Sequence, residues 1–310
     1  MFEHGWLAWV VFAVVIVGML ALDLGVVHRR SERLGMREAV IWTLVWIATA
    51  LVFNGWIYVS MGAQPALTFA TAYLIEKVLS VDNLFVFLII FSYFKVPEGL
   101  QHRVLFWGIL GAIILRGLLI TAGITLLDSF HWMTYLLGGF LVYTGFKTAF
   151  RKDEDIEPWK HPVIGLVYRF ARVLPDYRDD RFVVHEGNRW HVTPLFVVLI
   201  LIELTDVAFA LDSVPAVLAI STDPFLVFTS NLFAILGLRA LYFVVHEMMR
   251  VFQLLQHGVS VILVVVGAEM LLESFMDIPD VLLFSLIVLI MVGSIGGSVM
   301  LNRRQQLSSP

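Results

Sequence analysis

The sequence predicts an all-α, polytopic membrane protein. Hydrophobic residues make up 59% of the 310 residues, charged residues only 15%, and the mean hydropathy is +0.87. A chain this apolar is unlike an ordinary soluble domain, and it is equally unlike a disordered one. The apolar residues also gather in segments that are each close to the ~20 residues a helix needs to cross the hydrocarbon. We therefore expect a single membrane domain over residues 1–310 with about nine transmembrane helices.

The apolar segments are separated mainly by short polar connectors. The first segment begins near the N-terminus without a basic leader or a small-residue cleavage site, which indicates a retained span rather than a signal peptide. Only the connector at 151–191 is long, and we expect it to be a cytoplasmic loop. The nine segments cover residues 6–27, 39–61, 66–94, 103–126, 131–150, 192–220, 225–246, 257–275 and 280–301.

The distribution of lysine and arginine predicts how the chain is oriented. Four arginines lie in the first connector and eight basic residues lie in the loop at 151–191, whereas the N-terminus and the second, fourth, sixth and eighth connectors have none. Cytoplasmic connectors are enriched in lysine and arginine. We therefore expect a multi-pass protein of the bacterial inner membrane, with its N-terminus outside and its C-terminus in the cytoplasm.

The segment Ala72–Phe87, AYLIEKVLSVDNLFVF, carries four polar or charged residues inside an apolar run. An ionisable group at this depth of a membrane costs several kcal/mol unless it is partnered, and such groups usually mark functional sites. The four residues are Glu76, Lys77, Asp82 and Asn83.

A second segment, Leu199–Val217, repeats this pattern. Asp206 and Asp212 are six residues apart, as Glu76 and Asp82 are in the first segment. Ser213 directly follows Asp212, just as the small polar residue Asn83 directly follows Asp82. In an ideal helix the first acid and the small polar residue share a face, whereas the second acid falls off it. A locally distorted helix or acids that converge from two sides would each explain this spacing.

The spans that follow the two acidic segments also correspond. GILGAIILR, which ends at Arg116, matches NLFAILGLR, which ends at Arg239, and one span further on Gly145 falls where Gly267 does. A unit of three spans therefore occurs twice, and an odd number of spans makes the two copies run in opposite directions through the bilayer. The expected inverted repeats comprise residues 66–150 and 192–275, and the span at 280–301 follows them.

The middle thirds of these spans hold more acids than bases. Five acids and three bases lie there, so that a divalent cation or two protons would neutralise the centre. Lys77 is either a salt-bridge partner or a mobile cation that displaces the metal when the site is empty. Pro215 has no backbone N–H to donate to the carbonyl of Leu211, four residues earlier in the helix. This carbonyl is therefore available as an accessory ligand. We expect charge-balancing or coupling roles for Lys77, Arg116, Glu203 and Arg239.

Four stretches of the chain are similar to the TerC family of integral membrane proteins: MLALDLGVVHRR, EKVLSVDN, ELTDVAFALDSVPA and SNLFAILGLRALYF. The resemblance covers nearly the whole chain. It implies efflux of metal ions, chiefly manganese, and a relation to the LysE exporter superfamily through the inverted repeats. Asp23, in the first stretch, matches an acid of the family and is a further accessory candidate. The resemblance implies an ion site lined by Glu76, Asp82, Asn83, Asp206, Asp212 and Ser213.

We therefore expect a secondary transporter that exports a hard divalent cation, Mn²⁺ above others, in exchange for protons. No nucleotide-binding motif occurs, and we expect neither enzymatic activity, nor a permanently bound cofactor, nor nucleic acid as a partner. The expected partners are the lipid bilayer, the metal ion and protons. The alternative is a membrane partner or assembly factor, which supplies metal to other membrane or secreted proteins or helps to insert them. The absence of cysteine excludes disulfides and thiolate metal sites.

The predicted orientation can be tested with a reporter that is active only outside the cytoplasm. Fusions after Met61, Asp128, Asp223 or Asp277 should be active, because the even-numbered connectors lack lysine and arginine. Fusions after Arg33 or within 151–191 should be silent. An active fusion in the long loop would contradict both the orientation and the inverted repeat.

Overall fold

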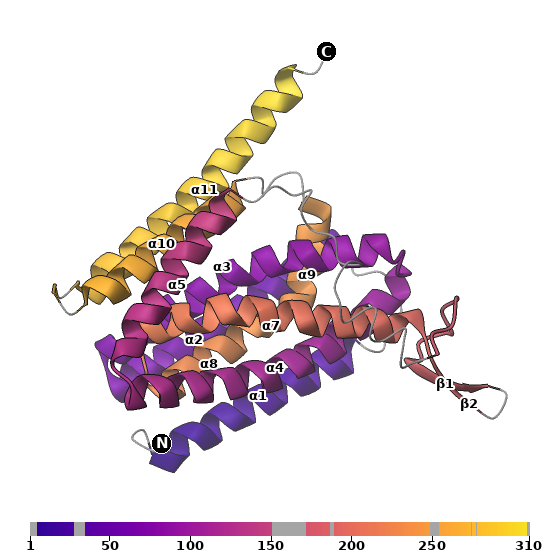
Figure 1. The fold of residues 1–310 in the computed structure, drawn as a ribbon, viewed down its shortest axis with the longest axis horizontal. Helices are drawn as coiled ribbons and strands as arrows, with labels where there is room; N and C mark the ends of the chain where they lie inside the picture. The colour runs from indigo at the N-terminus through magenta and orange to yellow at the C-terminus, as the bar shows by residue number, and fades with distance from the viewer. Residues whose placement is uncertain are drawn as a thin grey trace.

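The computed structural model describes residues 5–27, 35–150, 172–186, 189–248, 254–273, 275–276 and 278–308. In this part of the chain the fold is predominantly helical, with one short β-hairpin (Figure 1). The helices are α1 (Gly5–Val27), α2 (Met36–Met61), α3 (Ala63–Tyr93), α4 (Glu98–Ser129), α5 (Trp132–Ala149), α7 (Pro194–Ile220), α8 (Pro224–Ile235), α9 (Leu238–Met248), α10 (Leu255–Leu272) and α11 (Asp280–Ser308).

Several of these helices have the length and apolar character of membrane spans. Among the described residues, five helices qualify, namely α2, α4, α7, α10 and α11, and the number rises to six if the bent pair α8 and α9 is one span. Helix α3 is 31 residues long but carries Glu76, Lys77 and Asp82 near its middle, which lowers its apolar character. The prediction of a helical protein with several membrane spans is confirmed.

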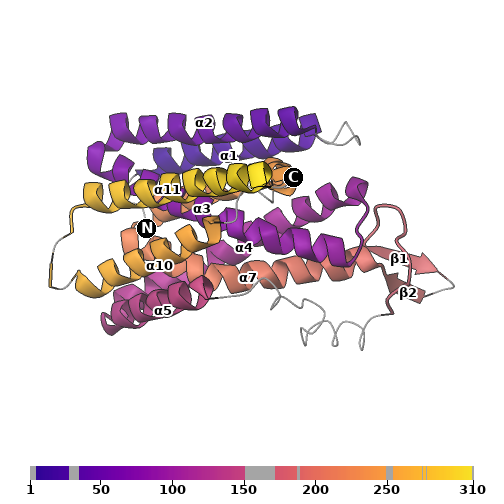
Figure 2. The same ribbon diagram turned by 90° about the horizontal axis from the view of Figure 1, so that it is seen from above.

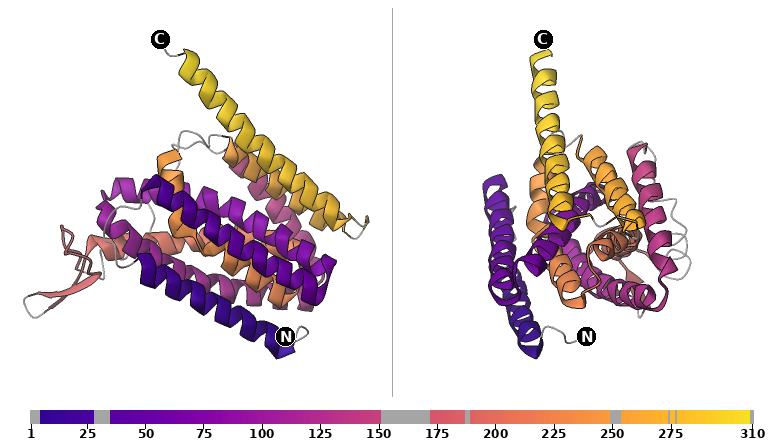
Figure 3. Two further views of the ribbon diagram at one scale, coloured as in Figure 1. Left: turned by 180° about the vertical axis from the view of Figure 1, so that it is seen from behind. Right: turned by 90° about the vertical axis from the view of Figure 1, so that its left-hand side faces the viewer.

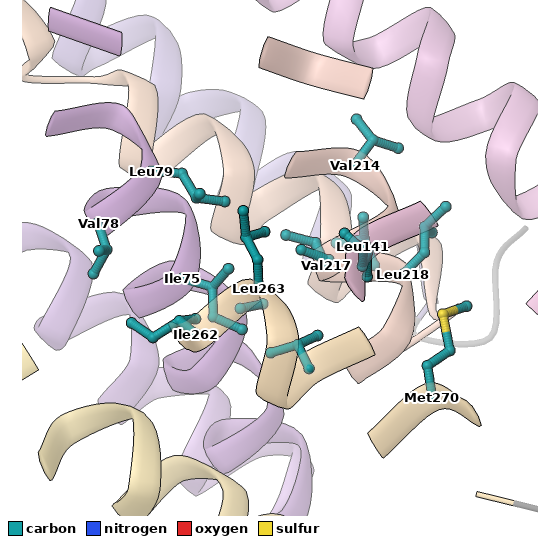
Figure 4. Packing of buried hydrophobic residues seen from close by; sticks show 14 of the residues in the cluster. Ile75, Val78, Leu79, Leu141, Val214, Val217, Leu218, Ile262, Leu263 and Met270 are labelled. Atoms are coloured by element: carbon teal, nitrogen blue, oxygen red, sulfur yellow. The ribbon is translucent and has the colours of Figure 1, made fainter. Parts of the chain in front are cut away.

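Helix α3 lies in the middle of the molecule. Helices α1 and α2 lie on one side of it, and the paired helices α5 and α10 lie on the opposite side (Figures 2 and 3). The C-terminal half of α11 extends beyond the other helices (Figures 1 and 3). Apolar side chains of α3, α5, α7 and α10 meet in one buried cluster (Figure 4), which includes Ile75, Leu141, Val217 and Leu263. This packing fixes the middle of α3, where the charged residues lie.

The sequence predicted one uninterrupted span at 225–246, and here the structure differs. The segment is broken into α8 and α9, whose axes differ by 46°. Gly237, at the break, has a φ of +83°, a conformation that glycine adopts readily and other residues avoid. A Cβ atom at this position would also lie 2.6 Å from Cδ1 of Trp46, a buried residue of α2. Only glycine fits here, because Trp46 fills the space beside the break.

The connector predicted as a cytoplasmic loop, 151–191, contains structure that the all-α prediction did not include. Its residues 151–171 lie outside the described residues, but β1 (Val183–Glu186) and β2 (Arg189–Val192) pair antiparallel. Tyr177 donates a hydrogen bond of 2.8 Å to the carbonyl of Phe94, at the end of α3. The Arg103 guanidinium of α4 lies 5.6 Å from the ring centroid of Phe182. These contacts attach the segment that precedes β1 to the end of α3 and to the first turns of α4.

Helices α5 and α10 approach each other closely at small residues. A Cβ atom at Gly267 would lie 2.8 Å from the backbone oxygen of Gly138, and a Cβ atom at Gly145 would lie 2.9 Å from that of Ser260. Small residues at such crossings allow backbones in a membrane to pack directly together. The neighbouring Gly139 has open space beside it, because a Cβ atom there would meet no neighbouring atom of the described residues within 4 Å.

Gly267→Ala should destabilise the protein, because the new methyl group would force the two backbones apart. Overpacking of this kind costs roughly 1–3 kcal/mol. The measurement is the midpoint of thermal unfolding of the purified protein in detergent. Gly139→Ala is the matched control and should leave the midpoint unchanged or raise it, since alanine favours helix. Equal midpoints for the two variants would show that the α5–α10 contact is not tight.

Candidate functional site

Arg116 of α4 lies between two carboxylates that come from two different helices. Its Nη1 donates to Oε2 of Glu76 on α3 at 2.5 Å, and its Nη2 lies 3.3 Å from Oδ1 of Asp206 on α7. The Nε group of the same arginine lies 3.4 Å from the other Asp206 oxygen, so that the guanidinium meets this carboxylate side-on. The exposed fractions are 1% for Arg116, 0% for Glu76 and 4% for Asp206. The three charges are therefore buried together.

A fourth residue, Asn231, joins this cluster from α8. Its Nδ2 donates a hydrogen bond of 2.7 Å to Oε1 of Glu76, the oxygen that Arg116 does not use. Both carboxylate oxygens of Glu76 thus accept hydrogen bonds from buried donors. Charge-assisted hydrogen bonds of this kind are what make a buried charge tolerable.

The backbone explains why these side chains meet. Helices α3 and α4 each pack against α7 and α8, and Glu76 and Asp206 occupy equivalent positions in the two acidic segments. Gly111 of α4 leaves room for a further acid, because the Glu203 carboxylate of α7 fills the space that a side chain at 111 would need. The Oε2 atom of Glu203 is buried there and has no hydrogen-bond partner among the described residues.

Lys77 does not point the same way as its neighbour Glu76. Its Nζ donates a hydrogen bond of 3.2 Å to the carbonyl of Ala234, in the last turn of α8 before the break. Arg239 lies in the first turn of α9, just after the break, and is buried. The charged residues of α3 therefore reach the broken helix at two places, at Asn231 and at Ala234.

The second half of each acidic segment lies further along its helix. Asn83 and Ser213 are buried, and Asp82 and Asp212 are half-buried. Both α3 and α7 are helical through these positions, and α7 continues as a helix through Pro215.

The two accessory candidates, the backbone carbonyl of Leu211 and the carboxylate of Asp23, stay predictions. The Leu211 side chain is 52% exposed. Asp23 belongs to the backbone of α1, but its side chain lies outside the described part of the chain.

Among the described residues, no group of three or more histidine, aspartate or glutamate side chains is arranged to hold a metal ion. In this conformation Glu76 and Asp206 face Arg116. Both acids are therefore paired with Arg116. Either acid can bind a metal ion only if its carboxylate moves away from the arginine or contacts the arginine and the metal ion at the same time.

Sequence reasoning did not single out Asn231 or the Ala234 carbonyl. A signal for Asn231 was present, because it is the first residue of NLFAILGLR and an amide within an apolar span. No property of the alanine side chain could have marked the carbonyl of Ala234, since its role arises from the break in the helix.

Fold and site together define a polytopic helical membrane protein with a buried, ion-paired centre. The family model described as the integral membrane protein TerC family matches residues 61–306. The chain belongs to this family.

Similar proteins match over most of their length. An uncharacterised membrane protein of Myxococcus xanthus, STKORF319, is 42% identical over 97% of this chain and 94% of its own. A protein of Escherichia coli K12 that carries the name of a proposed membrane-bound redox modulator, Alx, is 44% identical over 88% of each chain. A membrane protein of Rickettsia bellii is 36% identical over 94% of this chain and 97% of its own. No solved structure matches.

Arg116→Leu should strongly destabilise the protein, because it leaves Glu76 and Asp206 buried without their cation. Removing one member of a buried charge set typically costs ~3–5 kcal/mol. The measurement is resistance to unfolding in detergent. A triple variant with Arg116→Leu, Glu76→Gln and Asp206→Asn should recover most of the loss, because no uncompensated charge is left.

Arg103→Ala is the control for this experiment. Its pair with Asp180 is partly exposed, with exposed fractions of 31% and 56% for the two side chains, and exposed pairs contribute about 0–1 kcal/mol. The variant also loses the contact with Phe182, which contributes about 0.5–1 kcal/mol at an exposed site. If Arg116→Leu were no more harmful than Arg103→Ala, the buried ion pairs would not hold α3, α4 and α7 together.

Proposed function

We propose that this protein is a secondary transporter that exports a hard divalent cation, Mn²⁺ above others, from the cytoplasm in exchange for protons. In this proposal about nine spans cross the bacterial inner membrane, with the N-terminus outside and the C-terminus in the cytoplasm. The substrate binds at the middle of the membrane, between the two three-span units 66–150 and 192–275.

The observation that carries the proposal is the position of Arg116 between Glu76 and Asp206. Two carboxylates at equivalent places of two acidic segments meet one internal cation, buried from solvent. Such a centre can exchange one cation for another if one or both ion pairs with Arg116 break and the freed carboxylates bind an incoming ion. Asp82, Asn83, Asp212 and Ser213, further along α3 and α7, then supply further oxygen ligands to the ion.

The type of ligand supports a hard cation. The candidate ligands are carboxylates, an amide and a hydroxyl, which suit Mg²⁺, Ca²⁺ and Mn²⁺, whereas Zn²⁺ and Cu²⁺ bind more tightly where nitrogen or sulfur is offered. The chain has no cysteine, and its histidines lie away from the middle thirds of the predicted spans. Mg²⁺ gives up its water reluctantly, which favours the other hard ions. The final choice of Mn²⁺ follows the resemblance to the family.

The α5–α10 contact supports the inverted repeat. If Gly145 corresponds to Gly267, then Gly138 corresponds to Ser260, by the same offset along the chain. Gly138 lies against Gly267, and Gly145 lies against Ser260. Exchanging the units 66–150 and 192–275 therefore turns the Gly138–Gly267 contact into the Ser260–Gly145 contact. A two-fold axis in the membrane plane would require this relation.

The second candidate is a membrane partner factor that acts on other proteins. The part of the connector 172–192 that the structure describes favours it, because a hairpin with the exposed side chain of Trp190 extends from the end of the helix bundle (Figure 1). The name of the Alx relatives points to a redox role for those proteins. This chain has no cysteine, so a redox role here would not use thiols of its own.

Uptake of Mn²⁺ into vesicles that contain only this protein tests the proposal. Purified wild-type protein should move Mn²⁺ in the direction opposite to the flow of protons down an imposed gradient. Asp82→Asn and Asp212→Asn should each abolish transport while the protein still folds, because each removes a charged oxygen from the path. Asp128→Asn, at the exposed end of α4, is the matched control and should transport normally.

Two results would count against this function. No uptake by the wild type, with intact ability to act on other membrane proteins in cells, would favour the partner factor. Normal uptake by Asp82→Asn together with loss in Asp128→Asn would place the ion site at the membrane surface instead of the middle.

A further inference from the structure

The break between α8 and α9 places backbone groups inside the protein without the usual helical pairing. A helix that ends leaves its last four carbonyl groups without intrahelical partners. In a membrane these groups need partners from the protein or from a bound ion. Helix α8 ends at Ile235 and α9 begins at Leu238, turned by 46°. The carbonyl of Ala234 belongs to this last turn and is available to a donor or a cation.

Lys77 donates a hydrogen bond to this carbonyl. Its Nζ lies 3.2 Å from the Ala234 oxygen, whereas the neighbouring Glu76 carboxylate turns to Arg116 and Asn231. An ammonium group is a compact cation on a flexible stem with three donors. It also lies where the partial negative charge at the C-terminus of a helix favours a positive charge.

The same place suits a metal cation. Backbone carbonyl oxygens are ligands for hard divalent ions, and carbonyls at the ends of broken helices coordinate cations in other transporters. Asn231, one turn earlier on α8, already links this helix to Glu76, so the carbonyl turn of α8 and the Arg116 centre are adjacent. Trp46 of α2 lies directly beside Gly237 at the break.

We propose that the last carbonyl turn of α8, at Ala234, is a cation-binding position, and that the Lys77 ammonium occupies it when no metal is bound. An incoming divalent cation displaces Lys77, which returns when the metal leaves. Lys77 is thus a tethered competitor of the substrate. The inference rests on the proposed function for the nature of the cation, but it concerns binding and not transport.

The test is Mn²⁺ binding to the purified full-length protein by equilibrium dialysis. Lys77→Gln keeps a donor for the Ala234 carbonyl but loses the charge, and it should bind Mn²⁺ about tenfold more tightly than the wild type, a difference of ~1.4 kcal/mol. Lys77→Arg keeps the charge and should bind as weakly as the wild type. Lys147→Gln, an exposed lysine at the end of α5, is the matched control and should bind like the wild type.

Fluorotryptophan labelling locates the ion, because Mn²⁺ is paramagnetic and broadens nearby fluorine signals steeply with decreasing distance. The signal of Trp46, identified with Trp46→Phe, should broaden before those of Trp107 and Trp132. Lys77→Met, which loses charge and hydrogen bond together, replaces Lys77→Gln if that variant is not monodisperse.

The outcomes separate this inference from the proposed function. If the wild type binds and transports Mn²⁺ but the neutral Lys77 variants bind it no more tightly, the inference is wrong and the transporter proposal stands. The same holds if Trp107 or Trp132 broadens before Trp46. If neither the wild type nor the neutral variants bind Mn²⁺, both proposals fail.

Discussion

The buried contact between Arg116, Glu76 and Asp206 is the interaction on which the middle of this protein depends. Each charge alone would be costly inside an apolar bundle, and together they are tolerable because opposite charges and hydrogen bonds satisfy one another. The contact needs α3, α4 and α7 in one arrangement, since each supplies one member. Asn231 extends the requirement to α8. The same interaction therefore holds four helices together and forms the candidate ion centre.

The broken helix connects this centre to the rest of the molecule. Gly237 adopts a positive φ beside Trp46, so α2 takes part in shaping the break although it contributes no charge. On one side of the break lie Asn231 and the Ala234 carbonyl, and on the other lies Arg239. In a continuous helix a backbone N–H would be the partner of the Ala234 carbonyl, whereas at the break this carbonyl accepts a hydrogen bond from Lys77. The irregular backbone is located where it faces polar groups of the protein, as the absence of water from a membrane requires.

The helical character of the fold and several of its membrane spans could be predicted from the sequence. Hydropathy indicates helices within a few residues of α2 and α10, because the length and apolar character of a span are local properties of the chain. The break at Gly237 was missed, since NLFAILGLR is apolar enough for one continuous span and a lone glycine in a membrane helix is common. The hairpin β1–β2 was missed as well, because its strands are only four residues each, too short for a clear alternation of apolar and polar residues.

By itself the sequence determined which residues are unusual in this protein: acids and bases repeated at the same spacing within apolar spans, where every ionisable group must find a partner. The identity of each partner was decided by the tertiary structure. Arg116 pairs with both Glu76 and Asp206. Asn231 donates a hydrogen bond to Glu76, and Lys77 donates one to a backbone carbonyl of α8. These partners are far apart in sequence, and their distances depend on how whole helices pack and bend. Composition and spacing strongly constrain which residues are unusual, but they hardly constrain which partner each of these residues has.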